Sequence, residues 1–187
     1  MRPEMKEYKF DWMLWSTFDA ASKLKKGSEK EYRSTLSYIP YFRGTLESLF
    51  ASGEPGKLFM ECLARYFKNY ITARERGFHN AITTFCFSPA ILYAMDIFPI
   101  CFEVISVAQT FAYKRGTAEF LDYCNEAGYT ETSCSAQRGT LGAFLSGMGA
   151  EVDMILTDTP GVCDTNANAF AFAAAYLNKP FFALDTP

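Results

Sequence analysis

Two cysteines lie where side chains of α/β proteins commonly bind ligands. Cys134 comes directly before a helix expected over residues 135–148. Cys163 lies between an expected strand, residues 152–157, and an expected helix, residues 166–177. Loops that lead from parallel strands into helices gather at the carboxyl edge of the sheet, so the two thiols can converge although 28 residues separate them. Helix amino termini also stabilise thiolates, the form of cysteine that binds metal ions.

The pair by itself predicts an incomplete metal site. Iron–sulfur clusters and structural zinc ions usually take three or four protein ligands, and the two cysteines do not form a close C-x-x-C motif. At least one further ligand therefore has to come from another cysteine or from chain beyond Pro187. A zinc-binding or redox-active pair is the alternative that the residues themselves leave open.

The other four cysteines carry a weaker signal. Cys86, in a Cys-x-x-Pro setting, is a candidate further ligand, although we expect a structural role for it. Cys62, Cys101 and Cys124 fall inside expected helices or strands and are predicted to be core residues. Six cysteines are too few for a disulfide scaffold in a chain of this size, so we expect free thiols in a reducing compartment.

Glu103 is the single candidate for a catalytic role, and no other catalytic residue is assigned. It lies within an apolar segment, residues 99–106, that we expect to be a strand. A carboxylate there either lies at the ligand edge of the sheet or pairs with a basic residue, which makes it a candidate proton-handling group. His79, the only histidine, has no visible catalytic partner. The glycines of residues 135–148 do not form a G-x-G-x-x-G turn, so no dinucleotide site is predicted.

An α/β domain that follows a helical extension has to position these candidates. Residues 1–79 are predicted to form the extension, with helices over residues 11–26, 34–50 and 57–76. Residues 80–187 alternate short apolar runs with helical stretches, which is typical of a mostly parallel, flavodoxin-like or Rossmann-like sheet. The expected strands are residues 81–87, 99–106, 152–157 and 180–184. The expected helices are residues 89–95, 109–127 (as one or two helices), 135–148, whose glycines permit close packing, and 166–177.

Composition and charge exclude several classes of function. Hydrophobic residues make up 49% and charged residues 21% of the chain, which is the balance of a folded protein rather than a disordered one. A formal net charge of −3 offers no basic surface for nucleic acid. No signal peptide and no apolar run of about 18 residues are visible, so we expect a cytoplasmic protein that does not bind membranes.

Four segments occur in an order that resembles a known enzyme family. They are residues 85–99 (FCFSPAILYAMDIFP), 127–142 (AGYTETSCSAQRGTLG), 157–164 (TDTPGVCD) and 180–187 (PFFALDTP). Together they are similar to the successive landmarks of the 2-hydroxyacyl-CoA dehydratase and benzoyl-CoA reductase family, over about residues 80–187. Residues 1–79 match that family only in being helical. The resemblance implies the amino-terminal part of a longer chain that is built from two flavodoxin-like domains.

The same resemblance implies an oxygen-sensitive, anaerobic iron–sulfur enzyme. Its four-iron four-sulfur (4Fe-4S) cluster is held by three cysteines and keeps one iron open; Cys134 and Cys163 match the first two ligands, and the third would lie beyond Pro187. An acyl-CoA thioester that receives one electron there would become a ketyl radical. Loss of a hydroxyl group would make the enzyme a lyase, an (R)-2-hydroxyacyl-CoA dehydratase, and ring reduction would make it an acyl-CoA reductase. This chain alone would be inactive.

The partners implied by the resemblance are an acyl-CoA substrate, a second homologous subunit in a heterodimer and an ATP-dependent iron–sulfur activator protein. A flavin is conceivable in such a fold, but no motif supports one. Asp164 is followed by Thr-Asn-Ala-Asn, where many members have glycine and lysines, which is a departure from the family pattern. The departure suits the less catalytic of two paired subunits. The alternative function is a cluster-less, flavodoxin-like scaffold subunit that supports a catalytic partner.

Overall fold

The computed structural model describes residues 18–19, 53–112, 117–147, 149, 151–158 and 163–184. Apart from Phe18 and Asp19, which are helical, the predicted helices over residues 11–26 and 34–50 lie outside the described residues. The fold below therefore concerns the end of the predicted extension and the α/β domain.

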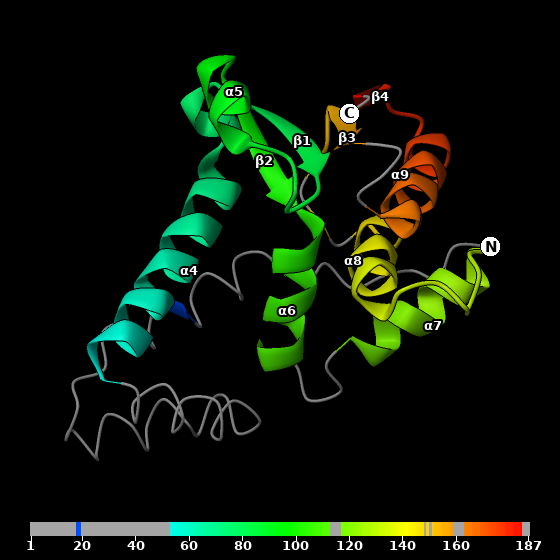
Figure 1. Ribbon diagram of the computed structural model, residues 1–187, viewed down its shortest axis with the longest axis horizontal. Helices are drawn as coiled ribbons and strands as arrows, with labels where there is room; N and C mark the ends of the chain where they lie inside the picture. The colour runs from blue at the N-terminus through cyan, green and yellow to red at the C-terminus, as the bar shows by residue number, and fades with distance from the viewer. Residues whose placement is uncertain are drawn as a thin grey trace.

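A sheet of four parallel strands organises the described part of the chain (Figure 1). The strands are β1 (His79–Thr83), β2 (Ile97–Cys101), β3 (Met154–Asp158) and β4 (Phe181–Leu184). They lie in the order β2-β1-β3-β4, and all neighbouring strands are parallel. The predicted α/β fold with a flavodoxin-like or Rossmann-like sheet is confirmed. The chain changes direction across the sheet between β1 and β3, which is the switch point where open α/β sheets bind ligands.

Helices connect these strands. The helix α4 (Glu54–Thr72) and the short 3₁₀ helix η1 (Arg74–Arg76) precede β1. The other helices, in chain order, are α5 (Pro89–Ala94), α6 (Phe102–Ala112), α7 (Ala118–Glu126), α8 (Ser135–Leu145) and α9 (Asp164–Leu177). Each helix predicted from residue 57 onward has a counterpart here. No described helix combines the length and the apolar character that are needed to cross a membrane.

The boundary between β2 and α6 differs from the prediction. The strand predicted over residues 99–106 is wrong in its extent, because β2 ends at Cys101 and α6 begins at Phe102. Glu103 therefore lies in the first turn of a helix and not inside a strand. The apolar run continues past the boundary, with Ile100 and Phe102 both buried, which explains the prediction. A carboxylate in a first helical turn is favourable because the helix dipole is positive there.

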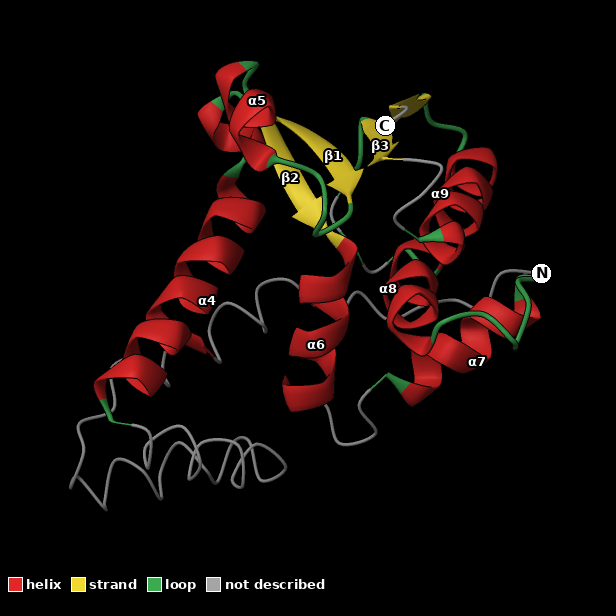
Figure 2. Cartoon of the chain, viewed as in Figure 1, coloured by secondary structure: helices red, strands yellow, loops and turns green. Residues whose placement is uncertain are grey.

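The two faces of the sheet are covered unequally. On one face, the main core contains Phe102, whose ring centroid lies 5.6 Å from that of Phe144 in α8 and 4.8 Å from that of Phe170 in α9. Figure 2 shows α7, α8 and α9 gathered in one group. The other face carries a small cluster of buried residues: Ala81, Leu92 and Ile97. Most of the apolar burial that stabilises the fold is thus on the side of α8 and α9.

The helices α7 and α8 pack backbone to backbone at Gly142. A Cβ atom at this position would overlap the carbonyl oxygen of Phe120 in α7. At Gly139 a Cβ atom would lie 3.0 Å from a methyl group of Thr117 and 3.1 Å from the hydroxyl oxygen of Ser106, which are side-chain atoms. The predicted close packing at the glycines of α8 is confirmed at these two positions.

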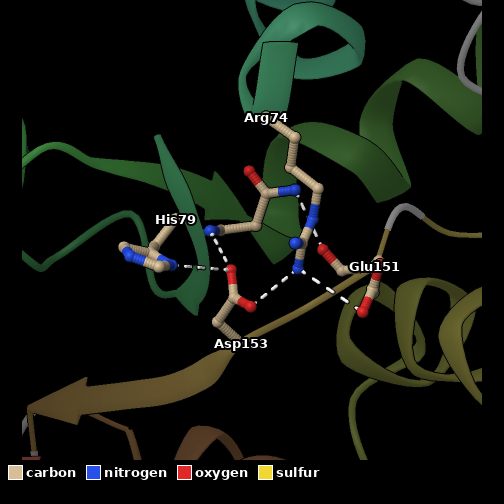
Figure 3. A network of polar contacts seen from close by, with 5 residues as sticks. Arg74, His79, Glu151 and Asp153 are labelled. Carbon is tan, nitrogen blue, oxygen red and sulfur yellow. Dashed lines mark hydrogen bonds and ion pairs between the residues drawn. The ribbon is translucent and has the colours of Figure 1, made fainter. Parts of the chain in front are cut away.

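A polar network joins η1 to the amino edge of the sheet (Figure 3). Arg74 Nη2 lies 2.6 Å from Asp153 Oδ1 and 3.6 Å from Glu151 Oε1. Asp153 Oδ2 accepts a hydrogen bond from the backbone N–H of Asn80 at 2.7 Å and lies 3.6 Å from His79 Nδ1. Desolvation acts to raise the pKa of Asp153, but the hydrogen bond from Asn80 and the charge of Arg74 outweigh it and hold that pKa below its ordinary value.

Candidate functional site

A buried hydrogen bond joins the loop after β1 to the end of β3. The strand predicted over residues 81–87 is wrong at its end, because β1 stops at Thr83 and leaves Thr84 and Cys86 in the loop. Thr84 Oγ1 donates to Asp158 Oδ1 at 2.9 Å and accepts from the backbone N–H of Cys86 at 3.2 Å. Thr84 and Asp158 are 1% and 5% exposed, so this bond is desolvated. It holds together the ends of the two strands that flank the switch point.

Glu103 connects three further segments at the same edge. Its Oε1 accepts a hydrogen bond from Gln137 Nε2, in the first turn of α8, at 2.7 Å. Its Oε2 accepts from the backbone N–H of Phe85 at 3.1 Å and from the thiol of Cys101 at 3.3 Å. Gln137 is 3% exposed, so its side chain has little access to water. One carboxylate thus joins the loop after β1, the end of β2 and the start of α8.

Cys134 and Cys163 each occupy the N-cap position of a helix; both were predicted near helix starts, but α9 begins at Asp164, two residues earlier than predicted. The carbonyl oxygen of Cys134 accepts from the backbone N–H of Arg138 at 3.0 Å, at the start of α8. The carbonyl oxygen of Cys163 accepts from the backbone N–H of Asn166 at 3.0 Å, at the start of α9. Neither cysteine side chain caps its helix with a hydrogen bond. Cys134 is exposed and Cys163 is partly exposed, so neither residue is buried in the core.

Cys86 lies in the electrostatic field of this edge. Desolvation raises the pKa of the Cys86 thiol, and the negative charges of Asp158, Glu103 and Cys163 raise it further. Its neighbours are therefore the residues that end β3, begin α6 and begin α9. Cys86 is exposed, and its predicted structural role stays a prediction.

Two other cysteines are held in the thiol form. Desolvation raises the pKa of Cys101 to about 12; a hydrogen bond with the backbone of Val104 acts in the opposite direction, and Glu103 adds to the rise. Desolvation likewise raises the pKa of Cys124 to about 11, against the charge of Arg138. A cysteine that keeps its proton is a poor metal ligand. The core role predicted for Cys124 is confirmed, whereas Cys101 is only partly buried.

Metal binding at this edge depends on which donor side chains the described residues bring together. Among them, no three His, Cys, Asp or Glu side chains are arranged to hold a metal ion. The thiols of Cys134 and Cys163 belong to α8 and α9, two helices that contact each other. Thiolates are the usual ligands of iron–sulfur clusters, and helix N–H groups suit sulfur atoms nearby. The donor chemistry of the two thiols fits such a cluster, and a third cysteine ligand beyond Pro187 stays a prediction.

A comparison with protein-family models identifies the family of this chain. The model described as 2-hydroxyglutaryl-CoA dehydratase, D-component, matches residues 84–187, which is more than half of the 187 residues. The chain belongs to this family. The match begins at Thr84 and includes Glu103, Cys134 and Cys163. Searches among curated proteins and among solved structures found no match.

Membership in the dehydratase D-component family confirms the resemblance that the sequence shows. The matched residues are those of the α/β domain, and the predicted extension contributes none of them. The family name indicates a component of a dehydratase. It also gives the carboxyl edge a functional context, because ligands of open α/β sheets bind at that edge.

The sequence analysis missed several polar residues of this dehydratase-family edge. One feature of the sequence points to Gln137 as a site residue: it lies one helical turn after Cys134 and so at the same end of α8. The bond between Thr84 and Asp158 had no signal, since 74 positions separate the two residues. Four buried polar atoms near these residues have no hydrogen-bond partner among the described residues: Thr83 Oγ1, Gln137 Oε1, Thr157 Oγ1 and Asn166 Oδ1.

Two further residues, Cys62 and Arg138, contribute no side chain to this edge. Cys62 is exposed on α4, so its predicted core position is wrong. Arg138, at 9% exposed, is turned away from the carboxyl edge toward the α7–α8 connection. Its Nη2 donates to Asn125 Oδ1 at 2.5 Å and its Nη1 donates to the carbonyl oxygen of Glu131 at 3.0 Å. Arg138 therefore stabilises the connection from α7 to α8, which leads to Cys134.

Proposed function

We propose that this chain is an iron–sulfur subunit of a 2-hydroxyacyl-CoA dehydratase, or of a related acyl-CoA reductase. The observation that carries the proposal is the pair Cys134 and Cys163, each at the N-cap of a helix within the region that matches the family. Their helices contact each other, and neither thiol is used for capping. Two thiols at positively polarised helix ends are suited to a cluster.

In this proposal, Cys134 and Cys163 supply two thiolate ligands of a 4Fe-4S cluster. A third cysteine would come from outside the described residues, in chain beyond Pro187. The backbone N–H groups in the first turns of α8 and α9 would stabilise the thiolates and donate to cluster sulfur atoms. Cys86 would stay a spectator, because its raised pKa disfavours the thiolate.

Bound at this edge, the cluster would supply single electrons to the thioester carbonyl of an acyl-CoA and so permit loss of a hydroxyl group or ring reduction. The residues of the chain would position the substrate and limit access of water. A homologous subunit would complete the site, and an ATP-dependent iron–sulfur activator protein would deliver the electron. The proposal includes both partners because the resemblance to the family implies them.

Anaerobic reconstitution with ferrous iron and sulfide tests the proposal, with a small thiol present to complete the ligand set. We expect the wild-type protein to retain iron and acid-labile sulfide and to give the electron paramagnetic resonance signal of a reduced 4Fe-4S cluster. Cys134→Ser and Cys163→Ser should each lose most of the bound iron, because a hydroxyl is a poor cluster ligand. Cys62→Ser is the matched control, since Cys62 is also an exposed cysteine but lies on α4.

Iron that binds equally well to Cys134→Ser, Cys163→Ser and the wild type would contradict the proposal. Wild-type protein that retains no iron would contradict it as well, and would favour the second candidate, a cluster-less scaffold subunit. Two observations favour that candidate: the described residues contain no group of three metal-binding side chains, and Asp164 is followed by Thr-Asn-Ala-Asn. A scaffold subunit should bind its partner subunit with unchanged affinity when both cysteines are serine, which a pull-down with the purified partner measures.

A further inference from the structure

We propose that Glu103 is a positioning residue, which holds the Cys134 end of α8 against the loop after β1 by accepting hydrogen bonds and not by exchanging protons. The functional part of this inference rests on the proposed function, because it treats Cys134 as a cluster ligand. The mechanical part, which concerns the first turn of α8, stands on the contacts of Glu103 alone. The inference replaces the proton-handling role that the sequence suggests for this residue.

Glu103 contacts three segments at this edge, and each of them carries a cysteine. The segment before α9, which carries Cys163, has no such contact among the described residues. Phe85 is adjacent to Cys86, Cys101 is a direct partner, and Gln137 lies one helical turn after Cys134. The bond to Gln137 is 2.7 Å long and is the shortest of the three. A charged acceptor strengthens such bonds, so Glu103 can fix the spacing between these segments.

The hydrogen-bond pattern suits a fixed acceptor rather than a proton shuttle. Both carboxylate oxygens are occupied by donors from the protein: an amide of Gln137, the backbone N–H of Phe85 and the thiol of Cys101. None of these three donors is an acid of ordinary strength, since desolvation raises the pKa of Cys101 to about 12. A group that handles protons needs a partner that can take or give one near neutral pH.

The substitution Glu103→Gln separates the two roles because this site can accept an amide. The carbonyl oxygen of the new amide can take the place of Oε2 and keep the bonds from Phe85 and Cys101. Its NH₂ group would then face Gln137, whose own Oε1 is buried and has no hydrogen-bond partner among the described residues. A flip of the Gln137 amide turns this oxygen toward the new donor, so the connection survives without the charge.

Hydrogen exchange measured by mass spectrometry tests the mechanical part on the protein without any metal. Glu103→Ala should speed amide exchange in the first turn of α8 on the order of tenfold, because the buried Gln137 amide loses its acceptor. Glu103→Gln should restore the wild-type rate there. The peptide that covers α9 is the internal reference, since α9 has no hydrogen bond to Glu103 among the described residues.

Gln137→Leu provides a second route if Glu103→Ala does not fold. It removes only the contact with α8 and leaves the acceptors for Phe85 and Cys101 in place, so exchange should rise in α8 and not in the loop after β1. The inference is wrong if Glu103→Gln exchanges as fast as Glu103→Ala, or if neither Glu103→Ala nor Gln137→Leu changes the rate.

The functional part is measured by iron content and by the spectrum of the reduced cluster after anaerobic reconstitution. We expect Glu103→Ala to retain less iron than the wild type, and Glu103→Gln to retain as much with the same spectrum. If the wild type itself binds no iron, the proposed function fails while the exchange rates still decide the mechanical part. If exchange rises in Glu103→Ala but iron content is unchanged, the link to Cys134 is refuted and the proposed function stands.

Discussion

Asp153 is a single carboxylate whose surroundings favour its charged form. It accepts a hydrogen bond from the backbone of Asn80 and pairs with Arg74, at the amino edge of the sheet. Its side chain is 23% exposed, so the pair with Arg74 is partly shielded from water. These contacts join η1, β1 and the start of β3, which are distant in sequence, and so we expect Asp153 to contribute to the stability of the fold.

Asp153→Asn should lower the free energy of unfolding at pH 7 by about 1 kcal/mol, because a charged hydrogen-bond acceptor becomes neutral. The pKa of Asp153 is lowered in the folded protein, so its contribution is present above the unfolded pKa of about 3.9 and is lost as the pH falls through the folded value. The difference between wild type and variant should therefore shrink below about pH 4. Urea denaturation followed by circular dichroism at pH 7 and pH 3 measures it.

Glu151→Gln is the matched control for Asp153→Asn. The side chain of Glu151 is 70% exposed and lies 3.6 Å from Arg74, so it should change stability by less than about 0.5 kcal/mol. A stability difference for Asp153→Asn that stays constant down to pH 3 would contradict the assignment of this pKa.

At the level of single residues, the sequence predicts what is local. The positions of Cys134 and Cys163 at helix starts follow from the residues beside them. The hydrogen bond from Gln137 to Glu103 could not be predicted, because it spans 34 positions and depends on how α6 packs against α8. Long-range partners are fixed by packing, which periodicity does not encode.

Gly142 determines how closely two helices approach. Gly142→Ala would place a methyl group on the carbonyl oxygen of Phe120, a backbone atom that cannot rotate away. We expect a loss of about 1–3 kcal/mol in the free energy of unfolding, despite the better helix propensity of alanine. Thermal unfolding followed by circular dichroism should show a lower midpoint temperature.

Gly139→Ala is the matched comparison for Gly142→Ala, in the same helix and with the same gain in helix propensity. Here the new methyl group meets side-chain atoms of Thr117 and Ser106, which can shift by a small amount. Its loss of stability should be clearly smaller. Equal losses at both positions would mean that contact with the α7 backbone is not what limits the packing.

At the level of elements, the sequence predicts the existence of a helix better than its buried face. The periodicity of the sequence favours an apolar face of α4 made of Leu58, Cys62, Leu63, Tyr66 and Tyr70. The residues that the structure buries are Gly56, Met60, Ala64, Phe67 and Tyr70. Tyr70 belongs to both sets and stacks on Phe98 of β2, with ring centroids 6.2 Å apart. Phe67 belongs only to the buried set and stacks on Phe18, with ring centroids 5.5 Å apart.

In the whole molecule, the two faces of the sheet are covered unequally. Mutations on the two faces should therefore differ in how much they lower the free energy of unfolding. Phe170→Ala removes a fully buried ring from the main core and should cost about 3–5 kcal/mol. Leu92→Ala removes the only buried side chain of α5 from a cluster of three buried residues, and should cost about 2 kcal/mol. Urea denaturation measures both, and a larger loss for Leu92→Ala would contradict this division.

At this largest scale, the sequence predicts topology well. The alternation of apolar runs with helical stretches predicts parallel strands, and the structure has four of them. The ends of β1 and β2 were misplaced, because buried residues continue past both strands into Thr84 and Phe102. The extent of a strand depends on its hydrogen bonds to neighbouring strands, and the sequence alone does not show those neighbours.

Because α5 covers its face of the sheet only thinly, it also affects local opening of the folded protein. Segments that bury few side chains detach from a native protein more readily than the rest, without global unfolding. Helix α5 has six residues and buries only Leu92, while the opposite layer is anchored by stacked rings. We therefore expect α5 to detach transiently together with the preceding loop, while α8 and α9 stay packed on the opposite face of the sheet. A bulky ligand would then enter beside Cys86.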